Sequence, residues 1–409
     1  MLYFVYNLVY DNVEVNMIEQ YIQKIKDGIY PTRNDWFSKY GVHGNAYNEL
    51  VKYKQNHCRQ IDLFTQEKSL YYNADYITPI LKTYHDRIIM NFEHMNYFLD
   101  RVEEVIVFSE VEATLEIEGI KTSRKKIEST LQKDVITTPE ERIIQNMKRG
   151  IEFINNHEIT EENIHQLYLI LSMDSLKDDE QLEGSFYRMS DVDIIGYYGE
   201  VSDRGVDAKN LGDAMKQLVS FINEQLTNQS EISYLVPHII HYYILYLHPY
   251  YDFNGRMARM LSYWYTLKCP FIEEKLPIFS EAINYNRKTK AQYYRSIESS
   301  RVDGNDLTYF LKTLFELGER FVSMYVQLYE IDQNTSKRMM NLTDNELSTI
   351  KTILLNIKYG DAFTWEQYHF MSKEQYSKQY TLKLMNGLVD KNVLELNKRG
   401  KINYYRMSM

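Results

Sequence analysis

The residues best suited to chemistry stand together between His248 and Arg259, in the sequence HPYYDFNGRMAR. His248 is a candidate general base, because an ordinary imidazole is largely neutral near pH 7. Asp252 is a candidate ligand for a hard cation such as Mg²⁺, which binds carboxylate oxygens. Arg256 and Arg259, three residues apart, would lie on the same side of a helix. The segment therefore combines a base, a metal ligand and two cations suited to a polyphosphate.

Two expected helices flank this segment and would position it. The preceding sequence, SYLVPHIIHYYILYL, is apolar almost all round and lacks turn residues after Pro237, which predicts a buried helix. The following sequence, GRMARMLSYWYTLK, has apolar residues at helical spacing, which predicts a second helix beginning near Asn254. The first N–H groups of a helix lack intrahelical partners and lie at the positive end of its dipole. This helix start is therefore a candidate anion site.

Composition narrows the class of protein. With 409 residues, 44% of them apolar and 25% charged, the chain is typical of a globular protein of two or three domains. Seven prolines and 16 glycines favour a mostly helical structure, and a net charge of −10 argues against a surface that coats nucleic acid. Only Cys58 and Cys269 occur, which indicates a reducing cytoplasm. The hydropathy pattern predicts neither a signal peptide nor a membrane span.

Three regions are expected along the chain: a helical N-terminal region over 1–105, a core over 106–332 and a C-terminal domain over 342–409. Within the core, the sequence DVDIIGYYGEVSDRG alternates around two glycines and predicts a two-stranded flap. Residues 306–332 predict a helix, and the polar sequence 333–341 predicts a linker.

The C-terminal domain has its own pattern. Thr343 followed by Glu346 is typical of a capping box at a helix start. Two short helices are expected around 364–371 and 373–389, followed by two strands within VLELNKRGKINYYRM. Residues 358–409 contain nine Lys or Arg and five Asp or Glu, so this part is locally positive.

Three helices and a basic β-hairpin resemble a winged helix-turn-helix domain. Such domains contact DNA or other proteins, and both alternatives stay open for this chain. A homodimer would also be ordinary for a domain of this kind.

The segment from His248 to Arg259 resembles the signature of Fic (filamentation-induced by cAMP) proteins, HPFx(D/E)GNGRxxR. The sequence TLEIEG, from Thr114 to Gly119, resembles the family's inhibitory motif, (S/T)xxxE(G/N). Residues 280–301 resemble the SxxIxxNxxxYYxxLxxxR region that closes the nucleotide pocket in that family. The resemblance implies a mainly α-helical, Fic-type core with a small β-hairpin flap, followed by the C-terminal winged helix.

The resemblance also implies an activity, the transfer of AMP from ATP, with Mg²⁺, to a Ser, Thr or Tyr hydroxyl. The acceptor would be a protein target or the chain itself. His248 would be the general base, and Asp252 would hold Mg²⁺. Asn254, Gly255 and Arg256 would stabilise the charge that develops at the α-phosphate.

The remaining nucleotide contacts implied by the resemblance come from three side chains. Arg259 would bind the β- and γ-phosphates together with Arg256. Tyr293 and Tyr294 would close the adenine side of the pocket, although a place in the core is an equal alternative in a chain with 37 tyrosines. His238 and His241 are expected to be buried, hydrogen-bonded histidines rather than metal ligands.

A built-in inhibitor is a further implication. Glu118 closes an expected helix over 100–118, with Gly119 as its C-terminal cap, and a helix C-terminus disfavours an anion without a cationic partner. In the family that partner is the second arginine of the motif, here Arg259. Thr114 lies one turn earlier on the same face. The alternative is an ordinary solvated glutamate.

One position departs from the family pattern, because Phe253 stands where glycine is usual. If the position requires a positive φ, phenylalanine would cost about 1–3 kcal/mol of strain.

Two functions other than AMP transfer stay open. One is a DNA-binding regulator whose Fic core senses a nucleotide, and the other is a hydrolase that removes AMP, in which Glu118 positions a water molecule.

Overall fold

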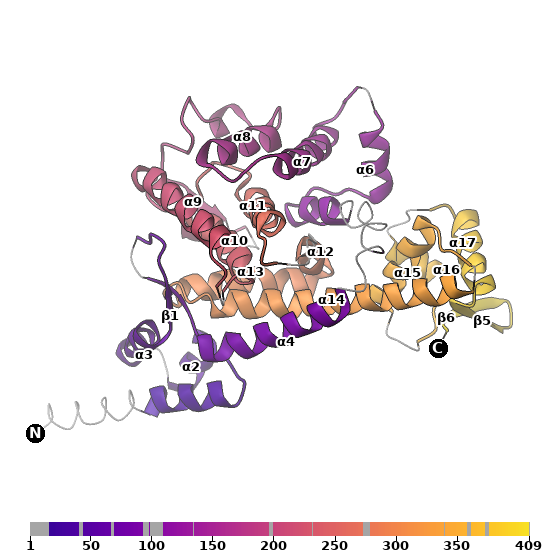
Figure 1. Cartoon of the computed structure of the whole chain (residues 1–409), viewed down its shortest axis with the longest axis horizontal. Coiled ribbons are helices and arrows are strands. Elements are labelled where there is room, and N and C mark those ends of the chain that lie inside the picture. Colours follow the sequence, from indigo (N-terminus) through magenta and orange to yellow (C-terminus); the bar gives the residue numbers. More distant parts are fainter. Residues whose placement is uncertain are drawn as a thin grey trace, which may run out of the picture. The chain divides into compact units, whose positions relative to one another are not determined.

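The computed structural model is mainly helical, as the sequence predicts (Figure 1). It describes residues 16–40, 44–66, 69–92, 98, 109–133, 135–195, 199–230, 232–272, 279–338, 340–357, 361–372 and 376–408. The chain divides into two compact units. The first comprises Met1–His85, Arg149–Lys275 and Arg287–Glu316, and the second comprises Asp86–Lys148, Leu276–Asn286 and Leu317–Met409. Helices α4 (Ala74–Phe92), α7 (Pro139–Asn156) and α14 (Thr308–Lys337) have residues in both.

The N-terminal part of the first unit contains a helix over 16–26, α2 (Arg33–Tyr40), α3 (Gly44–His57) and a hairpin of β1 (Arg59–Ile61) and β2 (Leu70–Tyr72). Lys54, on α3, joins this part to the rest of the unit. Its side chain is 1% exposed, and its ammonium contacts the carboxylates of Asp303 and, at 2.8 Å, Asp306. Tyr30 also donates to Asp306, at 2.5 Å. A buried lysine is stable only when paired, so this cluster fixes the N-terminal helices to the start of α14.

The core of the first unit is built around α10 (Val236–Leu247), which packs against α9 (Leu211–Thr227) and α11 (Asn254–Lys268). Every residue of α10 from Val236 to Ile244 is buried, because its sequence is apolar on all sides. Pro237 lies in the first turn, where its missing N–H has no cost. The expected buried helix and the helix start at Asn254 are both confirmed.

The remaining elements of this unit are α8 (Glu161–Ser172), η1 (Asp178–Glu180), η2 (Ala208–Asn210), α13 (Arg287–Val302) and the flap. The flap strands β3 (Asp193–Ile195) and β4 (Val201–Arg204) pair antiparallel, with Asp193 opposite Arg204. The expected hairpin is thus confirmed, and residues 196–198 between the strands lie outside the described part of the chain.

The second unit contains a helix over 109–117, α6 (Arg124–Leu131), α12 (Phe279–Asn284) and the C-terminal elements. The helix over 109–117 ends as expected at Gly119, whose φ is +82°. Gly119 N donates to Glu116 O at 3.1 Å, and Ile120 N donates to Leu115 O at 3.0 Å. These two bonds define a Schellman motif with Glu118 as the last half-helical residue. The beginning of the expected helix, 100–108, lies outside the described residues.

The C-terminal elements are α15 (Asp344–Asn356), α16 (Trp365–Met371), α17 (Lys378–Asp390), β5 (Leu394–Arg399) and β6 (Ile402–Met407). Thr343 and Glu346 form the expected capping box, in which Glu346 N donates to Thr343 Oγ1 at 3.3 Å and Thr343 N donates to Glu346 Oε2 at 2.8 Å. The strands β5 and β6 pair antiparallel in full register. Three helices followed by a hairpin are therefore present.

One expectation is wrong. Residues 333–337 continue α14 instead of forming a linker, and Thr335 is buried. Its hydroxyl donates to the carbonyl of Ile331 at 3.0 Å, so the helix itself satisfies the polar side chain. The last expected helix, around 373–389, is present as α17 and begins at Lys378, where Ser377 caps it; residues 373–375 lie outside the described part of the chain. Among the helices that the structure describes, none has the length and apolarity that a membrane crossing requires.

Candidate active site

The turn between α10 and α11 brings the chemically capable residues together. His248 closes α10 in the left-handed conformation, with φ 51° and ψ 58°, and its N–H donates to Ile244 O at 2.9 Å. Phe253 precedes α11 and is also left-handed, with φ 71° and ψ 4°. Only a few per cent of residues other than glycine adopt a positive φ. Two such residues at the ends of one six-residue turn indicate a backbone shape imposed by its surroundings.

Arg188 holds this turn from outside the motif. It is 2% exposed, and its guanidinium donates to four backbone carbonyls, those of His248 at 2.7 Å, Ser190 at 2.7 Å, Leu247 at 3.3 Å and Val206. Burial lowers the pKa of Arg188, yet an arginine side chain stays charged. The four carbonyls therefore provide most of the stabilisation of this buried charge. The side chain therefore occupies the C-terminus of α10, where the helix dipole favours a cation.

Backbone hydrogen bonds and close packing join the start of the flap to the same end of α10. Arg188 N donates to Pro249 O at 3.0 Å, and Gly205 N donates to Val192 O at 3.0 Å. A Cβ at Gly205 would come within 2.7 Å of Arg188 Nη2 and 3.3 Å of His248 Cβ. Glycine is thus required at position 205 by close packing rather than by its φ.

A second arginine, Arg301, also contacts the last turn of α10. Arg301, at the end of α13, donates to the carbonyl of Leu245 in α10 and contacts Asp203 in β4 at 2.8 Å. The last turn of α10 leaves carbonyls without intrahelical partners. Arg188 and Arg301 satisfy three of them from two other parts of the unit, which positions His248 and the flap relative to each other.

Asn254 organises the loop itself. Its Oδ1 accepts from Tyr250 N at 3.0 Å, and its Nδ2 donates to Tyr250 O at 2.8 Å. The ring of Tyr250 stacks on Tyr168 at 3.9 Å between centroids. Both tyrosines are buried, and burial raises their pKa above the range in which they would ionise. The two hydrogen bonds of Asn254 with Tyr250 therefore hold the turn in shape.

Phe253 is a buried residue and does not line an open site. It is 2% exposed, and the guanidinium carbon of Arg256 lies 3.4 Å from its ring centroid. Arg256 Nη2 also contacts Asp252 Oδ1 at 3.4 Å, and the same oxygen accepts from Phe253 N at 2.5 Å. The ring and the carboxylate together hold the first arginine of the motif, and this stabilisation offsets the strain of the positive φ.

Asp252 is the exposed member of this group. Its side chain is 46% exposed, against 6% for Arg256. The contacts given above use Oδ1, which leaves Oδ2 for a ligand. Within the described residues no cluster of three or more His, Cys, Asp or Glu side chains is placed to hold a metal ion. A Mg²⁺ ion normally takes only one or two carboxylates and fills its shell with water and phosphate oxygens, so Asp252 alone fits that requirement.

The other motif residues lie on the first turns of α11. Gly255 is half-buried, and Arg259 is 7% exposed. Burial, together with the positive charge of Arg259, lowers the pKa of His241 well below its usual value. Burial likewise lowers the pKa of His238 to about 3. Both histidines are therefore neutral core residues.

The two tyrosines on α13 differ in exposure. Tyr293 is 1% exposed, and its hydroxyl lies 2.9 Å from His241 Nε2, beside the ring of Phe310. Tyr294 is half-buried and contacts Tyr293 edge-on. Tyr293 thus occupies the core, whereas Tyr294 has a partly accessible ring. A role for either in binding adenine stays a prediction.

The residues of the inhibitory motif belong to the second unit. Thr114 is buried, Glu118 is half-buried and Gly119 is exposed. The arginines of α11 belong to the first unit. Inhibition by Glu118 stays a prediction.

Comparison with known proteins finds one family match and several similar structures. Residues 158–266 match the model of the Fic/DOC family. A Fic family protein from Desulfovibrio desulfuricans G20 is similar in structure, with 17% identity, a TM-score of 0.51 and coverage of 81% of this chain and 97% of that one. A fragment of Fic-1 from C. elegans is similar over 71% of this chain and 79% of its own, with 18% identity and a TM-score of 0.50. No curated protein matches the chain in sequence.

Proposed function

Since residues 158–266 form a Fic/DOC family domain, of a family generally known for nucleotide transfer to proteins, we propose that this chain is a protein adenylyltransferase. It transfers AMP from ATP to a Ser, Thr or Tyr hydroxyl of a protein target or of the chain itself. One observation supports the proposal above the others. His248, whose backbone N–H and carbonyl are both hydrogen-bonded, begins the turn that leads into α11, and α11 carries two buried arginines.

His248 acts as the general base in this proposal. Its imidazole takes the proton of the acceptor hydroxyl while the hydroxyl oxygen forms a bond to the α-phosphorus. The bond from that phosphorus to the bridging oxygen breaks, and pyrophosphate leaves. A well-placed base contributes about 10²- to 10⁴-fold to the rate, provided that its geometry is fixed. Arg188 supplies that fixation through the carbonyl of His248.

The phosphates bind at the start of α11. The free N–H groups of a helix start, here around Asn254 and Gly255, favour the charge that develops on the α-phosphate. Arg256 and Arg259 neutralise the β- and γ-phosphates and stabilise the leaving pyrophosphate. Because the Phe253 ring already orients Arg256, less conformational entropy is lost when the phosphate binds.

Asp252 holds the Mg²⁺ ion that accompanies ATP. When bound there, Mg²⁺ would supply positive charge that offsets the phosphates and helps to orient the leaving group. The contact of Asp252 with Arg256 and with Phe253 N fixes the plane of the carboxylate before the ion arrives. Tyr294, the partly accessible tyrosine of α13, is the better of the two candidates for contact with adenine.

Glu118 restrains the enzyme in this proposal by pairing with Arg259, which would otherwise bind the γ-phosphate. The Schellman motif supports this, because it fixes the backbone of Glu118 at a helix C-terminus, where a carboxylate gains most from a cation. A hydrolase that removes AMP would use the same residue to position water. The two roles predict opposite effects of its removal.

The experiment is transfer of label from α-³²P-ATP with Mg²⁺ to protein, compared with γ-³²P-ATP as a control for phosphorylation. Wild type, Glu118→Gly and Glu118→Gly/His248→Ala are compared. Label from the α position should rise in the single variant and fall at least about 100-fold in the double variant. A decrease in Glu118→Gly, measured instead as release of AMP from a modified protein, would support the hydrolase. No label in any variant that still binds ATP would leave the nucleotide-sensing regulator.

We also propose that the C-terminal elements form a winged helix-turn-helix domain. The hairpin tip supports contact with DNA, because Lys398, Arg399 and Lys401 are all exposed there. Binding of duplex DNA that weakens steeply as salt increases, and more weakly in Lys398→Ala/Lys401→Ala, is the expected result. Unchanged binding in that variant would favour a protein partner for this hairpin.

A further inference from the structure

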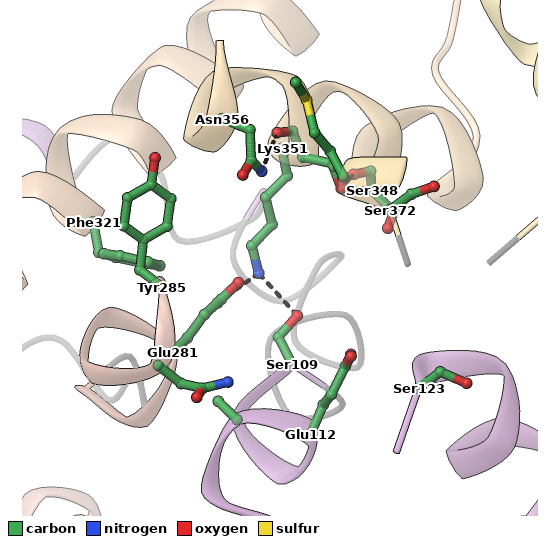
Figure 2. Close-up of a pocket in the computed structure, with 14 residues that line it drawn as sticks. Ser109, Glu112, Ser123, Glu281, Tyr285, Phe321, Ser348, Lys351, Asn356 and Ser372 are labelled. Carbon is green, nitrogen blue, oxygen red and sulfur yellow. Dashed lines mark hydrogen bonds and ion pairs between the residues drawn. The ribbon is translucent and has the colours of Figure 1, made fainter. Parts of the chain in front are cut away.

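A partly open pocket with polar lining residues lies in the second unit, between the helix over 109–117, α12, α15 and α16 (Figure 2). Its volume is about 170 Å³, and its lining includes Glu112, Asn284, Ser348 and Ser372. That volume exceeds by far the roughly 15 Å³ that one water molecule needs. The elements around it therefore meet across space that a small polar molecule can enter.

Lys351, on α15, spans one side of this pocket. Its side chain is 4% exposed, and its ammonium lies 2.7 Å from Glu281 Oε2 on α12 and 2.9 Å from Ser109 Oγ (Figure 2). One charged side chain thus joins three parts of the sequence, namely the C-terminal domain, α12 and the helix over 109–117. Burial of an ammonium is costly unless such partners are kept.

The helix over 109–117 is also attached to α12 at both of its ends. At one end the two carboxylate oxygens of Glu110 accept from the backbone N–H groups of Ser280 and Glu281, each at 3.3 Å. At the other end Asn284 Nδ2 donates to Glu116 Oε2 at 2.7 Å. Glu118 follows directly, so its position depends on these contacts.

We propose that the C-terminal domain restrains the inhibitory segment through the contact of Lys351 with Ser109. A small polar ligand that enters the pocket and draws Lys351 away would loosen the helix over 109–117 and release Glu118. This inference rests on the proposed adenylyl transfer and on inhibition by Glu118. It goes further by assigning the C-terminal domain a direct role in that inhibition.

Ser109→Ala is the most selective variant, because it removes the bond to the segment and leaves the pair of Lys351 with Glu281 intact. Lys351→Met/Glu281→Gln removes both contacts without leaving a buried charge unpaired. Lys391→Met is the matched control. Lys391 forms an ion pair of the same kind with Glu346, at 2.6 Å, within the same domain but away from the segment.

The first readout is amide hydrogen exchange of residues 109–117, which requires no activity. Exchange should become about tenfold faster in Ser109→Ala, as expected for loss of a hydrogen bond to a charged group, and should be unchanged in Lys391→Met. Equal exchange in all three variants and wild type would overturn the proposal.

The second readout is label transfer from α-³²P-ATP, with Glu118→Gly as the positive control. Ser109→Ala should raise transfer in the wild-type background and have no further effect when Glu118 is already glycine. An equal increase in both backgrounds would also overturn the proposal, because the effect would bypass Glu118. If exchange accelerates but Glu118→Gly itself transfers no label, the restraint stands and the proposed activity fails.

Discussion

Replacing Phe253 by glycine, the residue usual at this position in the family, should destabilise the first unit. Glycine would relieve the left-handed strain at φ 71°, which is worth about 1–2 kcal/mol. It would also remove a ring that is 2% exposed, and loss of a buried phenylalanine costs about 3–5 kcal/mol. The contact of that ring with the Arg256 guanidinium, at 3.4 Å, contributes up to about 2 kcal/mol more. The loss therefore exceeds the relief by about 1–6 kcal/mol.

Thermal unfolding followed by far-ultraviolet circular dichroism measures this balance. A loss of about 4 kcal/mol corresponds to a decrease of about 8–16 °C in Tm for a unit of this size. Phe253→Leu is the matched control, because it keeps the strain and most of the apolar burial, and it should lose less than Phe253→Gly. If Phe253→Gly were as stable as wild type or more so, the backbone strain would outweigh packing, and the Phe253 ring would not be what stabilises this turn.

Three further predictions concern the surroundings of the turn. Arg188→Lys should lower the free energy of unfolding by about 2–4 kcal/mol and reduce label transfer at least tenfold, because an ammonium cannot reach four carbonyls. Unchanged label transfer would show that His248 is positioned without Arg188. Asn254→Ala should cost about 1–3 kcal/mol in urea unfolding through its two bonds to Tyr250, and Asn254→Asp, which keeps the acceptor, should cost less. The pKa of His238 is about 3 in the folded protein and near 6.5 when unfolded. The free energy of unfolding should therefore fall by up to about 1.4 kcal/mol per pH unit as pH decreases from 6 towards 3. His238→Phe should remove this part of the pH dependence. An identical pH profile in the variant would contradict a lowered pKa at His238.

The parts of the structure that the sequence predicts are those coded by local pattern. The helix before His248 follows from an unbroken apolar run, the helix start at Asn254 from apolar spacing, and the C-terminal hairpin from alternation around a basic turn. Each signal lies within about 15 residues, so no knowledge of the tertiary structure is required. The linker expected over 333–341 shows the limit, because polar composition alone cannot reveal that Thr335 bonds to its own helix.

Arg188 is the functional residue that sequence reasoning missed. Its partners are backbone carbonyls, which have no side-chain signature, and His248 lies 60 residues away along the chain. An arginine in a loop is ordinary, so no pattern distinguishes it from a solvated one. The role of Phe253 was open for a similar reason, since its φ and its contact with Arg256 depend on the folded turn.

The buried contacts of Lys54 determine how small a working fragment can be. A protein shortened to begin after residue 85 would retain Asp303 and Asp306 but lose the only lysine that touches them within the described residues. Removing one partner of a buried ion pair costs about 3–5 kcal/mol, a large share of the stability of an ordinary domain. The stretch over 158–266 that matches the Fic/DOC family model contains neither Lys54 nor these two aspartates, so it is only a part of the first unit. The N-terminal helices, whose sequence suggests no chemistry, therefore belong in any fragment that keeps Asp303 and Asp306.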